Sequence, residues 1–173
     1  MTSDPTPLTR FQRMLLGTDG TVTHLLEAYA EEPIDVFKLL QRIEPAEGVD
    51  AALDVSPGDE VLRRQVVLRG RRSGRSLLYA EALIAVARIE PAVLDGLVAT
   101  DRPIGVLLAE NRTETFREII RVDHGPAGPF GTHFGIDEGA EMIWRTYRIV
   151  VRRRPVMLIT ERFPADSFRD LPA

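Results

Sequence analysis

Apolar residues follow a helical spacing at the start of the chain and a strand-like spacing further on. Apolar side chains three and four residues apart predict a helix over 8–16. A second helix is predicted over 22–30, with Thr21 or Thr23 as its N-cap and Pro33 as its end. The chain therefore begins with two short helices joined by a turn.

Beyond these helices, most segments have the alternation or the β-branched content of strands. The predicted strands are 34–44, 60–70, 77–87, 112–122, 141–151 and 156–164. Short helices are expected at 92–99 and 104–111, and irregular segments at 45–59 and 124–139, the latter with five glycines and two prolines. Strands paired mostly as hairpins, with grouped helices, predict an α+β fold built on an antiparallel sheet of about six strands.

Composition limits the classes of function. The 173 residues, 44% hydrophobic and 28% charged, predict a single soluble domain over 1–173 with loose ends at 1–10 and 165–173. The net charge of -4 gives no overall attraction to nucleic acid or anionic membranes, and the arginine runs at 69–75 and 152–154 coincide with expected hairpin turns. No signal peptide, membrane-spanning stretch or cysteine is present, so we expect a cytoplasmic protein without disulfides.

Three ionisable residues stand at unexpected positions in the strand pattern. Because alternate strand residues share a face, Arg64, Glu81 and Glu161 each fall on a face that is otherwise apolar. A buried charge is costly unless it is paired or binds a polar ligand. One interpretation is a structural ion pair such as Arg64 with Glu81, and another is a closed pocket for a small anion, with a desolvated glutamate as acid or base. A register shift of one residue would instead place these charges outside.

Other catalytic patterns are absent from the sequence. No two of its three histidines have the i, i+4 spacing of a helical zinc site, and no phosphate-binding, dinucleotide-binding or serine-nucleophile motif occurs. The residues therefore indicate no metal site.

Four segments together resemble the chorismate pyruvate-lyase family. They follow the order of that family's signatures and cover most of residues 11–164: LLGTDGTVTHLLE at 15–27, LRRQVVL at 62–68, RPIGVLL at 102–108 and PVMLITERFP at 155–164. The resemblance implies an antiparallel sheet whose helical flaps enclose a buried ligand cavity. It also implies a reaction without metal or cofactor, in which chorismate yields pyruvate and a hydroxybenzoate, with 4-hydroxybenzoate as the expected isomer.

The resemblance also assigns roles to single residues. It implies that Arg64 binds a substrate carboxylate, that Glu161 contacts the hydroxyl of the aromatic product, and that the backbone N–H groups of Val22 and Ile104 help to hold the carboxylate. Family members nearest the bacterial ubiquinone-pathway enzyme carry arginine where this chain has Glu81. The chain thus resembles a divergent branch, and Glu81 remains a substrate-binding candidate.

Two other functions remain open at this point. The same fold is similar to the effector-binding domain of GntR-type regulators, which suggests a non-catalytic module for a small aromatic acid. The few residues before Phe11 leave no room for a DNA-binding domain, so we expect no nucleic-acid partner. A lyase that forms 3-hydroxybenzoate, or that acts on a related chorismate-derived acid, is the second alternative. In each case the expected partner is a small molecule.

Overall fold

A six-stranded antiparallel sheet forms the centre of the protein. The computed structural model describes residues 7–169. The strands are β1 (Ile34–Pro45), β2 (Glu60–Gly70), β3 (Ser76–Ala85), β4 (Phe116–Pro126), β5 (Glu141–Val151) and β6 (Arg154–Pro164). Their order across the sheet is β1-β2-β3-β6-β5-β4, and each neighbouring pair is antiparallel. The predicted α+β class with six antiparallel strands is confirmed.

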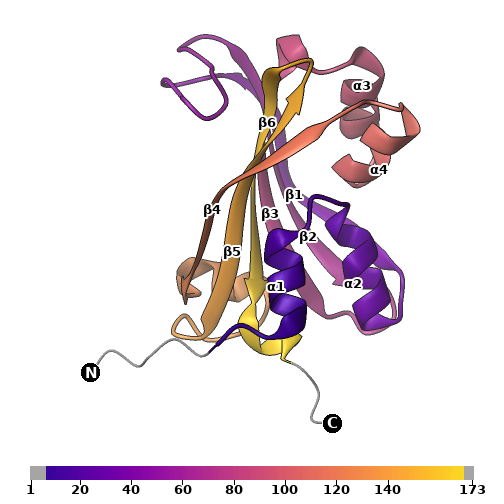
Figure 1. Cartoon of the computed structure of the whole chain (residues 1–173), viewed down its shortest axis with the longest axis vertical. Helices are drawn as coiled ribbons and strands as arrows, with labels where there is room; N and C mark the ends of the chain where they lie inside the picture. Colours follow the sequence, from indigo (N-terminus) through magenta and orange to yellow (C-terminus); the bar gives the residue numbers. More distant parts are fainter. Residues whose placement is uncertain (1–6, 170–173) are drawn as a thin grey trace.

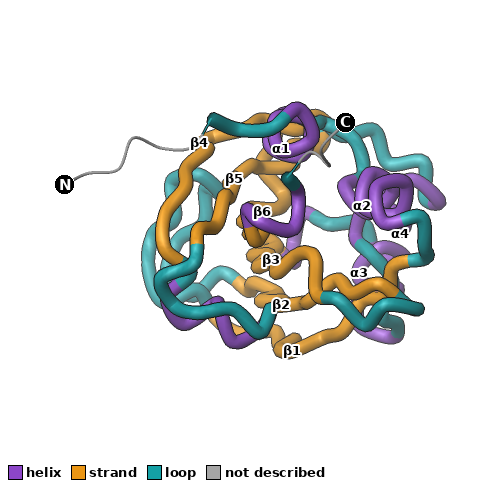
Figure 2. Tube along the Cα trace, turned by 90° about the horizontal axis from the view of Figure 1, so that it is seen from below, coloured by secondary structure: helices purple, strands orange, loops and turns teal. Residues whose placement is uncertain are grey.

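Short helices cover one face of this sheet. The helices are α1 (Arg10–Gly17), α2 (Val22–Ala30), α3 (Pro91–Ala99) and α4 (Ile104–Glu110), with 3₁₀ turns η1 (Val86–Arg88), η2 (Gly128–His133) and η3 (Ala165–Phe168). Figure 1 shows α1 and α2 over one half of the sheet and α3 and α4 over the other. The view in Figure 2 shows the strands curving around the side that these helices occupy. None of the helices in the described part of the chain is long and apolar enough to cross a membrane.

The two helix pairs bury separate apolar clusters against the same face. Leu15 and Leu26, from α1 and α2, belong to one cluster with side chains of β2, β3 and β6. Leu97 and Leu107, from α3 and α4, belong to a second cluster with side chains of β3, β5 and β6. Burial of these leucines stabilises each helix pair on the sheet. The strip of sheet between the clusters is where a pocket forms.

Strand register determines which side chains face that strip. Arg64 on β2 is opposite Ala82 on β3. Glu161 on β6 is opposite Ala80 on β3 and Arg145 on β5. Directly paired residues share a face, so these side chains all lie on the helix-covered side. The two small alanines leave space beside the arginine and the glutamate.

Some element boundaries differ from the sequence predictions. The fourth strand lies at Phe116–Pro126 instead of 112–122, because Arg112 has a positive φ of 51° in the turn that ends α4. The last turn contains only Arg152 and Arg153, both in the left-handed region, and β6 begins directly after them. The segment predicted to be irregular over 124–139 is partly ordered as the end of β4 and as η2.

The expectation of loose ends is wrong for the described residues near each terminus. Phe168 in η3 is fully buried and packs in a tilted orientation against the rings of Phe11 and Tyr29. Thr9 caps α1 and also donates a hydrogen bond to the Phe168 carbonyl at 2.8 Å. The two ends therefore close one edge of the core together. Residues 1–6 and 170–173 lie outside the described part of the chain.

Candidate active site

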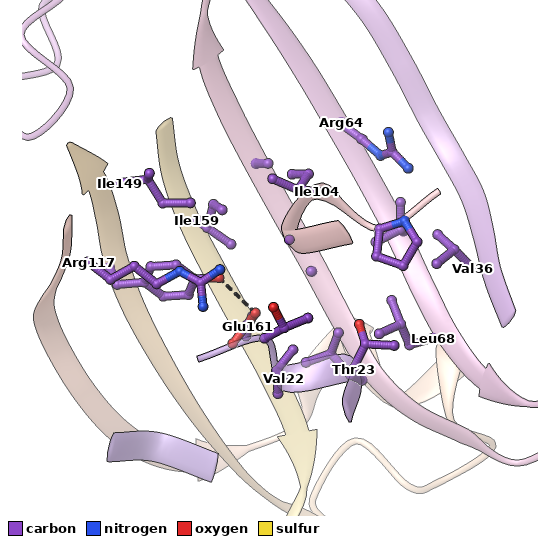
Figure 3. A pocket seen from close by; sticks show the side chains of 18 residues that line it. Val22, Thr23, Val36, Arg64, Leu68, Ile104, Arg117, Ile149, Ile159 and Glu161 are labelled. Atoms are coloured by element: carbon purple, nitrogen blue, oxygen red, sulfur yellow. Dashed lines mark hydrogen bonds between the residues drawn. The ribbon is translucent and has the colours of Figure 1, made fainter. Parts of the chain in front are cut away.

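A partly enclosed pocket lies between the two helix pairs. Its empty space, counted together with the solvent-open mouth, is about 610 Å³, and most of its wall is aliphatic. Arg64, Arg117 and Glu161 are the charged residues that line it. Figure 3 shows Arg64 and Arg117 entering from opposite sides, with Glu161 between them. A mostly apolar cavity with a few charged groups is typical of a site for a small organic anion.

Arg64 is a buried cation, and no carboxylate among residues 7–169 is in direct contact with it. Only 2% of its surface is exposed, and its guanidinium donates to the carbonyls of Leu97 at 3.3 Å and Arg102 at 2.9 Å. Burial lowers the pKa of Arg64, an effect that the charge of Asp101 partly opposes. Two of the five N–H donors of a guanidinium are thus used, and the remainder are free to bind an anion in the pocket.

Glu161 is held by two side chains from β5. Its Oε2 accepts a hydrogen bond from Arg145 Nε at 2.8 Å, and its Oε1 accepts one from the Tyr147 hydroxyl at 2.9 Å. Arg145 and Glu161 are 1% and 3% exposed. These two contacts fix the orientation of the carboxylate, and each oxygen keeps a lone pair for a ligand. The pocket therefore presents an oriented hydrogen-bond acceptor.

Tyr147 supports this arrangement as a permanent donor. Burial raises its pKa well above the ordinary tyrosine value, and the negative charge of Glu161 raises the pKa further. The phenol therefore keeps its proton at neutral pH and donates a hydrogen bond to the carboxylate. This contact fixes the direction in which Glu161 faces the pocket.

The beginnings of α2 and α4 close the pocket opposite the sheet. Val22 and Ile104 are the first residues of these helices, and both line the pocket. Backbone N–H groups in the first turn of a helix have no partner within the helix, so they can donate to a ligand. The two helix starts lie so close together that a Cβ added at Gly105 would be only 2.8 Å from Thr21 Oγ1. Four of the five predicted site residues, all except Glu81, therefore meet at one pocket.

The expected placement of Glu81 is wrong. Glu81 lies on the face of β3 opposite the pocket, where Tyr79 donates a hydrogen bond to it at 2.6 Å and Gln65 at 3.5 Å. The pocket-facing residues of β3 are Leu78, Ala80 and Ala82. Both faces of this central strand are largely apolar and covered, so its alternation could not identify the pocket side. A structural ion pair of Arg64 with Glu81 is excluded by the same placement.

Sequence reasoning missed Arg145 and Arg117. Arg145 alternates with Ile143 and Tyr147 on the pocket face of β5, so the face argument used for Arg64 would have found it. Arg117 lies on the edge strand β4, next to a bulge and among largely exposed residues. Nothing in its local pattern distinguishes it from a solvent-exposed arginine.

Comparisons with known proteins identify the family of this chain. A model of the family described as "Chorismate pyruvate-lyase Rv2949c-like" matches residues 15–169. The chain belongs to this enzyme family. Chorismate pyruvate-lyase of Mycobacterium tuberculosis is 32% identical over 178 residues, which cover 95% of this chain and 85% of that protein. The Mycobacterium leprae enzyme of the same name is 31% identical, with 95% and 79% covered.

More distant relatives share the fold. A putative lyase of Methanocaldococcus jannaschii, MJ0807, is 27% identical over 91% of this chain and 79% of its own length. Among solved structures, the effector domain of PhnF from Mycobacterium smegmatis superposes with a TM-score of 0.68 at 16% identity, with 89% of this chain and 96% of that chain covered. A GntR-family regulator from Bacillus cereus gives 0.61 at 11% identity, with 81% and 97% covered. Lyases of this family and these regulators thus share one architecture.

Proposed function

We propose that this lyase converts chorismate to 4-hydroxybenzoate and pyruvate. The observation that carries the proposal is the buried guanidinium of Arg64, whose partners in the described part of the chain are backbone carbonyls. It shares an apolar pocket with the oriented carboxylate of Glu161. Such a pocket is suited to a ring acid that also carries a hydroxyl group. The relatives in mycobacteria are named chorismate pyruvate-lyase, which supports chorismate as the substrate and pyruvate as a product.

The reaction is an elimination within one substrate molecule. The C4–H proton of chorismate leaves, the C3–O bond breaks, and the electron pair departs with the ether oxygen as the enolate of pyruvate. A proton added to the methylene carbon of that enolate completes pyruvate. The ring becomes aromatic and keeps its C4 hydroxyl, which gives 4-hydroxybenzoate. Atoms and charge balance without an oxidant, a metal or a cofactor, so we expect none to be needed.

Arg64 orients the ring in this proposal. Its free N–H donors bind the ring carboxylate, and the backbone N–H groups of Val22 and Ile104 add hydrogen bonds from the helix starts. Because Arg64 is already fixed by two backbone carbonyls, little side-chain freedom is lost when the substrate binds. The apolar wall then excludes water from the ring.

Glu161 is the group that moves the proton. It faces the carbon that bears the hydroxyl, accepts the C4 proton and gives it to the methylene carbon of the pyruvate enolate. The regenerated carboxylate then accepts a hydrogen bond from the product hydroxyl. Arg145 and Tyr147 hold its two oxygens in place and are positioning residues for this step. The proposal thus gives the buried ion pair a chemical use in addition to its structural one.

Incubation of purified protein with chorismate tests the proposal. We expect one pyruvate for each chorismate consumed, with 4-hydroxybenzoate as the aromatic product by chromatography and with turnover unchanged after dialysis against a chelator. Formation of 3-hydroxybenzoate would favour the isomeric lyase. Binding of hydroxybenzoate without pyruvate release would favour a non-catalytic module.

A further inference from the structure

Arg117 reaches the pocket from the edge strand β4 and is the second arginine in its wall. Its Nη1 donates to the carbonyl of Asp19 at 2.8 Å and also to the carbonyl of Gly20. Its guanidinium lies 5.9 Å from the ring centre of Tyr147. Its Nε is buried and has no hydrogen-bond partner within residues 7–169. A buried donor without a partner is costly, so it indicates a site for an acceptor.

The charges around the pocket do not cancel. Glu161 is neutralised by Arg145 at 2.8 Å. Arg64 and Arg117 are then left as two cations whose described partners are backbone carbonyls. They stand on β2 and β4, at opposite sides of the pocket, as Figure 3 shows. Two separated, uncompensated guanidiniums match a ligand that carries two separated anionic groups.

We propose that Arg117 binds a second carboxylate, the one on the ether-linked side chain of the substrate. This inference rests on the proposed function, because chorismate carries one carboxylate on its ring and another on its enolpyruvyl group. With Arg64 on the ring acid, the side chain of the substrate extends past Glu161 toward Arg117. The site therefore selects dicarboxylates over ring monoacids.

The same contact acts on the leaving group. When the C3–O bond breaks, negative charge develops on the enolpyruvyl oxygen next to the side-chain carboxylate. A fixed cation on that side stabilises the developing charge, since the two backbone carbonyls already hold Arg117 in position. The aromatic product has lost this carboxylate, so it loses the contact to Arg117 and keeps those to Arg64, Glu161 and the helix starts.

A pair of stable ligands tests the inference without any turnover. The diacid 3-(carboxymethoxy)-4-hydroxybenzoate carries an ether-linked carboxylate where the monoacid 4-hydroxy-3-methoxybenzoate carries only a methyl ether. We expect wild-type protein to bind the diacid about tenfold more tightly or better, because a charge-assisted hydrogen bond is added. Calorimetric titration measures both dissociation constants, whether or not chorismate is a substrate.

Arg117→Gln should abolish this preference for the diacid while changing the affinity for the monoacid less than about threefold. Arg117→Lys keeps the charge and should retain part of the preference. Arg121→Gln is the matched control, since Arg121 lies on the same strand, paired with Asp123 on the other face, and should leave the preference intact. A preference that persists in Arg117→Gln would overturn the inference. Equal weakening of both ligands would also overturn it, because Arg117 would then only shape the pocket.

These experiments distinguish a failure of the proposed lyase activity from a failure of the proposed Arg117 site. If wild-type protein prefers the diacid through Arg117 but releases no pyruvate from chorismate, the function is wrong and the second carboxylate site stands. If pyruvate is released but Arg117→Gln keeps the preference for the diacid, the function stands and the site is wrong.

Discussion

Arg64 on β2 and Glu161 on β6 face the same pocket from strands that only β3 separates. Ala80 and Ala82 are the residues of β3 opposite them, and their small side chains leave the space between the two charges open. Neither charge contacts the other directly, since Arg64 binds backbone carbonyls and Glu161 binds Arg145 and Tyr147. The two charges therefore flank an open pocket instead of pairing with each other.

Replacement of Arg64 by methionine should remove most of the activity without unfolding the protein. We expect kcat/KM for chorismate to fall about 100-fold, because charge-assisted hydrogen bonds to the ring carboxylate are lost. Circular dichroism checks the fold, and Arg63→Gln, which removes a charge from the other face of β2, is the matched control. A variant that unfolds would show that Arg64 is structural.

Glu161→Gln should lower turnover more than it weakens product binding. The amide still accepts a hydrogen bond but cannot take up the C4 proton, so kcat should fall about 100-fold or more. The variant should also lose about 3 kcal/mol of stability, because Arg145 is left without its counter-charge. The double variant Arg145→Met with Glu161→Gln should recover part of that stability but none of the activity. An unchanged kcat in Glu161→Gln would remove this residue from the mechanism.

Glu81→Gln should leave kcat and KM within about twofold of wild type, because Glu81 lies on the far face of β3. Its hydrogen bond with Tyr79 belongs to a cluster under η2, in which the buried Tyr79 ring stacks on His133. Steady-state kinetics with chorismate check this expectation. A large loss of activity would show that residues on the far face of β3 affect catalysis in the pocket.

Gly105→Ala should disturb the closure of the pocket. The added Cβ would lie 2.8 Å from Oγ1 and 2.9 Å from Cγ2 of Thr21, so the starts of α2 and α4 must move apart. Thr21 is stiff because it is β-branched, so we expect kcat/KM to fall about tenfold. Thr21→Ala in the same chain should restore activity, since the Thr21 side chain makes no capping hydrogen bond. Failure of this rescue would show that another contact is responsible.

Glu32 should make stability depend on pH in the acidic range. Hydrogen bonds from the Ser73 side chain, and from the Ser73 and Arg72 amides, hold its pKa below the usual value of 4.5. A lowered pKa stabilises the fold above pH 4.5, and this contribution is lost as pH falls through the native pKa. Glu32→Gln should therefore melt several degrees below wild type at pH 7, and the difference should shrink toward pH 3. A constant difference would show that the charge of Glu32 plays no part.

The sequence was sufficient for the architecture and for the two central site residues. Helical spacing located α2 to the residue, and alternation placed Arg64 and Glu161 on the correct faces, because β2 and β6 each have one continuous apolar side. The sequence prediction failed at Glu81, because β3 is covered on both sides and its alternation does not distinguish the pocket face from the opposite face. Arg117 gave no local signal, because its environment is created by a loop almost a hundred residues earlier in the chain.

Pyruvate release from chorismate is the decisive measurement for the proposed lyase activity. A coupled assay on purified wild-type protein should show catalytic release in a 1:1 ratio to chorismate consumed, and the Arg64→Met variant should show about one hundredth of that rate. Absence of pyruvate above a heat-denatured control, or equal rates for the two proteins, would contradict the account.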